Sequence, residues 1–131
     1  PGFISYYSGL QNLKVLAGIK NKIGNLQIRD AMKRVGLDPD LKLSVKKYSL
    51  GMRQRLGLAQ AMMESPSVLI LDEPMNGLDK NGVEEIRQLL LSMKNDHKTI
   101  VIASHNAEDI QVLCDEVYEM ENGKLCNMNT V

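Results

Sequence analysis

The chain has 131 residues, of which 44% are hydrophobic, a share that suits one globular domain with a buried core. The sequence contains no apolar run near the ~18 residues that span a bilayer and no signal-peptide pattern, so we expect neither a membrane span nor a secreted protein. Its two cysteines, Cys114 and Cys126, stand in no metal-binding spacing. We expect reduced, packed thiols of an intracellular protein rather than a disulfide.

The net charge is zero, but the charges are unevenly divided along the chain. Residues 1–63 contain eleven Lys or Arg and three Asp or Glu, a balance of +8, whereas residues 64–131 contain five and thirteen, a balance of −8. This asymmetry predicts two parts with different surroundings. A basic half suits nucleic acid, an acidic membrane face or simply a solvated helical surface. Because no stacking aromatic beyond Tyr48 interleaves the basic residues, no nucleic-acid partner is expected.

The first half of the chain predicts helices. Residues 8–20 place apolar side chains at helical spacing after Ser8, whose hydroxyl suits an N-cap. Residues 25–36 form a second amphipathic pattern that Gly36 ends. We expect the apolar face of this second helix to comprise Leu26, Ile28, Ala31, Met32 and Val35.

Residues 49–71 predict a long helix followed by a strand. The helix is expected to be capped by Ser49 and to end at Ser65-Pro66. The run Ser-Val-Leu-Ile-Leu at 67–71 is short and continuously apolar, which is typical of a strand buried on both faces.

The remaining residues alternate between helix and strand. We expect a helix over 81–96 with acids in its first turn and a lysine near its end, a second buried strand within 98–105 and a short helix over 106–114. Asn122-Gly123 predicts a hairpin that ends the chain. Strand–helix–strand order implies an α/β fold with a parallel sheet and right-handed crossovers.

Polar side chains follow both predicted parallel strands: Asp72 and Glu73 after the first, Ser104 and His105 after the second. Ligands of open parallel sheets bind beyond the carboxyl ends of the strands. A magnesium nucleotide needs a carboxylate for the hydrated metal and a group that orients or deprotonates the attacking water. Asp72 suits the first role, Glu73 the second, and His105 could clamp the γ-phosphate or the water. The alternative is that these acids only cap a helix or line a loop.

Three stretches in this order and spacing resemble the nucleotide-binding subunit of an ABC transporter: YSLGMRQRLGLAQAMM, VLILDEPMNGLD and IVIASH. The resemblance implies a P-loop NTPase-like parallel sheet with an N-terminal helical subdomain, residues 1–64, and the C-terminal part of a RecA-like ATPase core, residues 65–131. It also implies that Asp72 binds magnesium and that Glu73 and His105 are catalytic.

The family's signature motif, Leu-Ser-Gly-Gly-Gln, falls on Tyr48 to Met52, where Leu50 replaces the first glycine and Met52 the glutamine. Ser49 and Gly51 remain, and a hydroxyl with the N–H groups of a helix N-terminus can hold phosphate. The family's D-loop falls on Asn76 to Asp79, which places Asp79 among the nucleotide-binding residues. The opening PGFISYYSGLQNLKVL and the signature are similar to ATPases of bacitracin- and lantibiotic-type exporters in Gram-positive bacteria.

The family's phosphate-binding loop, G-x-x-x-x-G-K-[ST] or Walker A, is absent from the 131 residues, whose single Gly-Lys pair is Gly123-Lys124 in the predicted hairpin. In the family this loop precedes the helical subdomain. We therefore expect the chain to be the C-terminal part of a longer ATPase and to be inactive alone; the alternative is a natural relative that lacks the loop. We also expect self-association, either by pairing along the sheet edge left open beside residues 99–103 or by swapping the terminal hairpin.

The resemblance implies an ATPase subunit of a transporter that uses ATP and Mg²⁺, with a second ATPase subunit and a membrane permease as partners. We expect it at the cytoplasmic face of the cell membrane, where it exports an antimicrobial peptide or a similar compound. The alternative is a non-transport ABC ATPase of the translation or repair type. A non-catalytic regulatory module is disfavoured because Glu73 and His105 are both present.

Overall fold

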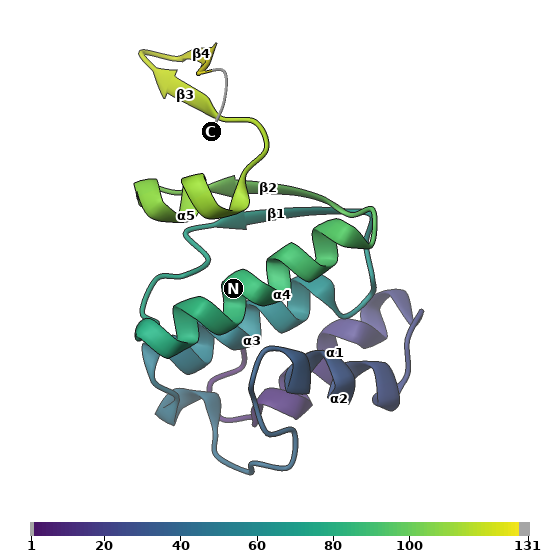
Figure 1. Cartoon of the computed structure of the whole chain (residues 1–131). Helices are drawn as coiled ribbons and strands as arrows, with labels where there is room; N and C mark the ends of the chain where they lie inside the picture. Colours follow the sequence, from purple (N-terminus) through teal and green to yellow (C-terminus); the bar gives the residue numbers. More distant parts are fainter. Residues whose placement is uncertain (1, 129–131) are drawn as a thin grey trace.

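The computed structural model describes residues 2–128 and shows a helical first half followed by alternating strands and helices (Figure 1). The predicted α/β architecture, with a parallel strand pair and a terminal antiparallel hairpin, is confirmed. The elements in chain order are α1 (Gly9–Lys20), α2 (Asn25–Arg34), the 3-10 helix η1 (Val45–Lys47), α3 (Leu50–Met62), β1 (Val68–Asp72), α4 (Lys80–Asn95), β2 (Thr99–Ala103), α5 (Ala107–Leu113), β3 (Tyr118–Glu121) and β4 (Lys124–Asn127).

Ser8 begins α1, as the sequence predicts. Its hydroxyl accepts a hydrogen bond from the Gln11 N–H at 3.2 Å, and the Gln11 side chain accepts one from the Ser8 N–H at 2.9 Å. This reciprocal capping box satisfies two backbone donors of the first turn. Gly9 follows, and a Cβ at this position would lie 2.5 Å from Tyr48 Oη. Helix α1 thus packs closely on the residue that precedes the cap of α3, and burial raises the pKa of Tyr48.

Helix α2 buries Ile28, Ala31 and Met32 as predicted, and Gly36, at φ +82°, ends it. The prediction for Leu26 is wrong, because its side chain is 80% exposed. An α-helix advances by 3.6 residues per turn, so Leu26 lies roughly 200° around the helix axis from Ile28. It therefore belongs to the solvent face of α2.

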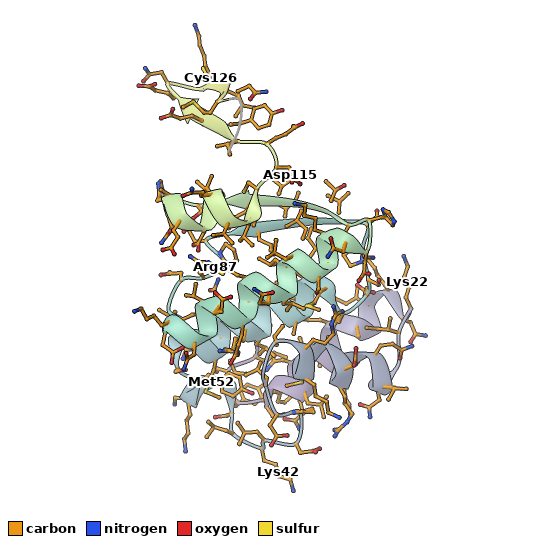
Figure 2. All side chains as sticks on the ribbon, viewed as in Figure 1. Lys22, Lys42, Met52, Arg87, Asp115 and Cys126 are labelled. Atoms are coloured by element: carbon orange, nitrogen blue, oxygen red, sulfur yellow. The ribbon has the colours of Figure 1, made fainter. Side chains whose placement is uncertain are left out.

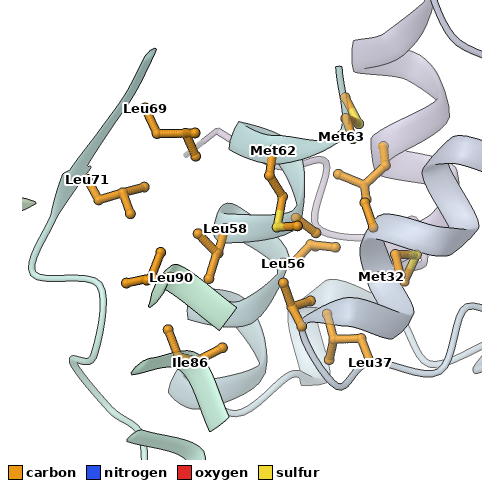
Figure 3. Packing of buried hydrophobic residues seen from close by; sticks show 14 of the residues in the cluster. Met32, Leu37, Leu56, Leu58, Met62, Met63, Leu69, Leu71, Ile86 and Leu90 are labelled. Carbon is orange, nitrogen blue, oxygen red and sulfur yellow. The ribbon is translucent and has the colours of Figure 1, made fainter. Parts of the chain in front are cut away.

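Strands β1 and β2 pair in parallel, from Val68 opposite Thr99 to Asp72 opposite Ala103. Leu69 and Leu71 are buried against α3 and α4, whose apolar side chains face them in Figure 3. The opposite face is open: Ile70 is 77% exposed and its β2 neighbour Val101 is 51% exposed. The prediction of strands buried on both faces is therefore wrong for residues 2–128, whose helices cover one face of this sheet.

Helix α4 begins earlier than predicted. Asp79 is its N-cap, with Oδ1 accepting the N–H of Gly82 at 2.7 Å. The helix therefore starts at Lys80, and no acid lies in its first turn, contrary to the prediction. Lys94 lies in the last turn, as predicted, where a cation complements the helix dipole.

A buried ion pair joins α5 to α4. Arg87 donates to Asp109 Oδ1 from Nε at 2.9 Å and from Nη2 at 2.5 Å, and both residues are buried. Arg87 is labelled in Figure 2. The hydrogen bond to Asp109 raises the pKa of the Arg87 guanidinium. Because α5 directly follows the segment that carries His105, this pair fixes the carboxyl end of β2 relative to α4.

The terminal hairpin is confirmed: Asn122 and Gly123 both have positive φ, 50° and 75°, as a tight two-residue turn requires. Strands β3 and β4 are exposed along their length and stand apart from the helices in Figure 1. In the part of the chain that the structure describes, no helix is both long and apolar enough to cross a bilayer.

Candidate functional site

The candidate site lies where β1 and β2 end. Asp72 is the last residue of β1, pairs in register with Ala103 and is exposed. Within residues 2–128 no hydrogen bond or ion pair engages its carboxylate. An exposed, unengaged carboxylate at the end of a parallel strand suits a hydrated cation.

Glu73 follows in a conformation that side chains rarely adopt, with φ +47°. Residues other than glycine occupy this left-handed region only when their surroundings hold them there, and such residues cluster at functional sites. Its N–H donates to the carbonyl of Ala103 at 2.8 Å, which extends the parallel pairing one residue beyond β1. Its carbonyl accepts hydrogen bonds from the Asn76 N–H at 3.1 Å and from Gln54 Nε2 at 2.9 Å.

The side chain of Glu73 reaches across to β2. Its Oε1 accepts the backbone N–H of His105 at 3.0 Å, and the His105 Nε2 atom lies 3.9 Å from the same oxygen. The imidazole is fully exposed, and the Glu73 side chain is 39% exposed. The structure thus brings together the two residues that the sequence singles out for hydrolysis. Ser104 has a local task instead, because its Oγ accepts the Asn106 N–H at 3.0 Å.

The signature residues lie at the start of α3. Ser49 is the N-cap, and its Oγ accepts the Met52 N–H at 3.1 Å. A Cβ added at Gly51 would lie 3.0 Å from the carbonyl oxygen of Gly77, so the helix start packs tightly on the turn that follows Glu73. Leu50, which departs from the family pattern, packs on Gly77 itself, where φ is +80°. The N-terminus of α3 and the residues after β1 therefore form one continuous surface.

Asp79 has a structural role that the sequence did not predict, as the cap of α4. Its carboxylate is engaged by the Gly82 N–H, although the residue is exposed. A nucleotide contact of Asp79 would have to use the other carboxylate oxygen or the backbone.

Sequence reasoning missed two polar residues of α3 that reach other elements. Gln54 bonds the carbonyl of Glu73. Arg55 Nη1 donates to the Val35 carbonyl at the end of α2, at 2.8 Å, and to Glu85 on α4, at 2.9 Å. A signal for Gln54 was available, because it lies four residues before the buried Leu58 and so shares its inward face.

Among residues 2–128 there is no cluster of three or more His, Cys, Asp or Glu side chains that could hold a metal on its own. Mg²⁺ does not require one, since it commonly binds through one or two carboxylates together with water and substrate phosphates. The exposed Asp72 fits that kind of site. A separate groove of about 540 Å³ has Ser65 and Lys98 in its lining, at the amino ends of β1 and β2, away from Glu73.

Known proteins are similar to this chain in sequence and in fold. A profile of the ABC transporter family matches residues 5–76, more than half of the chain. An uncharacterized ABC transporter ATP-binding protein, YybJ of Bacillus subtilis, is 45% identical over 91% of this chain and 55% of its own length. The bacitracin transport ATP-binding protein BcrA of Enterococcus faecalis is 40% identical over 95% of this chain and 41% of its own length. The lantibiotic transport ATP-binding protein SrtF of Streptococcus pyogenes is 38% identical over 95% and 54%.

Solved structures agree on the fold. CbiO1 of Clostridium perfringens, described as part of the ABC transporter complex CbiONQ, superimposes with a TM-score of 0.76 at 31% identity, over 95% of this chain and 51% of that one. The dimeric ABC transporter cassette MJ0796 superimposes with a TM-score of 0.82 at 20% identity, over 99% and 60%. The chain spans about half the length of the curated relatives it matches. The family match and the fold together show that this chain belongs to the ABC transporter family.

Proposed function

We propose that this chain supplies the signature helix and the hydrolytic carboxylates of an ATP-hydrolysing ABC transporter subunit. The observation that carries the proposal is the meeting of Glu73 with His105 at the ends of β1 and β2, beside the exposed carboxylate of Asp72. Glu73 accepts a hydrogen bond through one carboxylate oxygen and is still partly exposed, so it retains acceptor capacity for a water molecule.

Each polar group then has one task. Asp72 would hold the magnesium ion, whose charge offsets that of the phosphates when ATP is bound. Glu73 would orient and deprotonate the attacking water, the part of a general base. His105, with its imidazole free in solvent, would contact the γ-phosphate or the water.

The N-terminus of α3 would face a nucleotide held by a second subunit. It presents a hydroxyl at Ser49, a close backbone approach at Gly51 and the positive end of a helix dipole, which together favour phosphate. Asp79, at the adjacent turn, would contribute at the same interface. The dimeric form of the related cassette MJ0796 supports this pairing.

The phosphate-binding loop would come from a segment outside these 131 residues, since no G-x-x-x-x-G-K-[ST] sequence occurs in them. The isolated chain is therefore expected to lack ATP turnover. A membrane permease would be the further partner, and the subunit would then lie at the cytoplasmic face of the cell membrane. The CbiONQ complex named for one relative supports such an assembly.

The transported compound would be bacitracin, a lantibiotic or a similar antimicrobial, because two relatives at 38% to 40% identity are named for such transport. The test is to express the full-length ATPase with its permease in a sensitive Gram-positive host and to measure the inhibitory concentrations of bacitracin and of a lantibiotic. At least one of the two inhibitory concentrations should rise. Asp72→Asn should abolish that rise, whereas Asp96→Asn, which replaces an exposed acid at the end of α4, should leave it unchanged.

Two different failures remain distinguishable in that experiment. If neither inhibitory concentration changes while the purified protein hydrolyses ATP, the substrate class is wrong. If Asp72→Asn keeps both resistance and normal magnesium dependence of ATP turnover, the assignment of Asp72 is wrong.

A further inference from the structure

One hydrogen bond connects the signature helix α3 to the backbone of Glu73: Gln54 Nε2 donates to the Glu73 carbonyl oxygen at 2.9 Å. The two residues are 19 positions apart, and Gln54 is half-buried. The Gln54 side chain makes no other hydrogen bond within residues 2–128. The Glu73 carbonyl is thus the group that satisfies this half-buried amide, and leaving such a donor unpaired is costly.

The conformation of Glu73 needs such support. Its φ of +47° is disfavoured for a residue with a side chain. Pro74 follows, and a residue before proline is pushed toward the extended region by the proline ring. The local sequence therefore favours an extended conformation of Glu73, in which its carbonyl and its side chain would point in other directions.

Three bonds oppose that change. The Glu73 N–H is bonded to Ala103, and its carbonyl receives the N–H of Asn76 within the same turn. The Gln54 bond differs from these because it comes from another element and acts on the peptide unit between Glu73 and Pro74. It thus fixes the orientation of Glu73 relative to α3, while the carboxylate accepts the His105 N–H at 3.0 Å.

We propose that Gln54 is a positioning residue for hydrolysis: its amide holds the Glu73 backbone in the left-handed conformation that directs the Glu73 carboxylate toward the amide of His105. The inference rests on the proposed function, in which Glu73 is the general base. Because Ser49 caps the same helix, the element proposed to face the partner's nucleotide also positions the base of its own subunit.

The test uses the full-length ATPase with Gln54→Met, which keeps the length of the side chain but removes the donor. Gln54→Glu serves as a second variant of the same shape without an N–H, so that a folding failure of one variant leaves the other. Gln60→Met is the matched control on the same helix, since within the described residues 2–128 no hydrogen bond joins Gln60 to the turn at residues 73–79. Steady-state turnover gives kcat and the KM for ATP.

Loss of one hydrogen bond of ordinary net strength should lower kcat about tenfold in both Gln54 variants. The KM for ATP should stay within about twofold, because Gln54 does not contact the nucleotide. Gln60→Met should match the parent. A folded Gln54 variant with parental kcat, or one with raised KM and unchanged kcat, would overturn the inference.

A Glu73→Gln background separates positioning from a general structural effect. If Gln54 acts through the Glu73 carboxylate, Gln54→Met should lower single-turnover phosphate release in the parent but not in the Glu73→Gln protein. The same tenfold loss in both backgrounds would refute the positioning role. Near-normal turnover of the Glu73→Gln single variant would instead refute the proposed function. An inactive Glu73→Gln protein, combined with Gln54 variants that keep the parental kcat, would refute only this inference.

Discussion

Replacing Arg87 by Met should destabilise the chain strongly, because it leaves the Asp109 carboxylate buried without its partner. The Arg87 side chain is 11% exposed and that of Asp109 is 6% exposed, so neither charge is well solvated. Two guanidinium donors converge on one carboxylate oxygen, and this contact is the main cause of the raised Arg87 pKa. Removing one partner of a buried pair costs about 3–5 kcal/mol of unfolding free energy.

The lower end of that range, about 3 kcal/mol, is expected here, since methionine retains most of the apolar stem and α5 has only seven residues to rearrange. Urea denaturation followed by far-ultraviolet circular dichroism measures the change, since the chain has no tryptophan. Lys94→Met is the matched control on the same helix. Its ion pair with Asp115 is exposed, so the loss should be at most about 1 kcal/mol.

A double variant, Arg87→Met with Asp109→Leu, provides the decisive comparison. Replacing both charges by apolar groups removes the unpaired carboxylate and should restore most of the lost stability. Equal losses for Arg87→Met and Lys94→Met, or no recovery in the double variant, would refute the account of a buried charge pair between α4 and α5.

Three further outcomes follow from packing and burial. Gly9→Ala should lower the unfolding free energy by about 1–3 kcal/mol, because the new Cβ would lie 2.5 Å from the Tyr48 hydroxyl. Gly18→Ala in the same helix has no atom within 4 Å of its Cβ and should raise the unfolding free energy by up to about 1 kcal/mol. Urea titration of both variants measures the two changes. The raised pKa of Tyr48 favours the neutral phenol in the folded state. The contribution of Tyr48 to the unfolding free energy should therefore be fully present below pH 10 and decline as the pH rises toward the folded pKa. Tyr48→Phe should flatten that decline in alkaline titrations. Light scattering over a concentration series should show self-association of the 131-residue chain. Ile70→Lys should reduce it and Ile19→Lys should not, because both side chains are 77% exposed but only Ile70 lies on the open sheet face. A strictly monomeric parent would contradict this expectation.

The helices and turns could be predicted from the sequence because their signals are local. The hydroxyls of Ser8 and Ser49 cap the helices that they precede, and Asn122-Gly123 makes the turn that its residues favour. The pairing of β1 with β2 followed from their order and apolar content. This pairing brings Glu73 and His105 to the same end of the sheet, where the Glu73 carboxylate accepts the His105 N–H.

Other features depend on packing partners that a single segment does not reveal. The continuous apolar run of β1 predicts a strand buried on both faces. Ile70 is nevertheless exposed to solvent, because the helices within residues 2–128 pack on one face of the sheet only. The sequence predicts Leu26 on the apolar face of α2, but the helical rotation places its side chain in solvent. Helical spacing predicts that Gln54 faces inward, but its partner is a backbone carbonyl 19 residues away, which the spacing does not identify.

The proposed role of Glu73 as the base of an ATP-hydrolysing subunit is tested by Glu73→Gln in the full-length protein. The amide keeps the shape of the carboxylate but cannot accept the proton of the attacking water. Magnesium-dependent ATP turnover should fall by a factor on the order of 10² or more, while ATP still binds and dimers accumulate. Glu84→Gln, an exposed acid on α4, should retain parental turnover. Near-normal hydrolysis by Glu73→Gln would contradict the account.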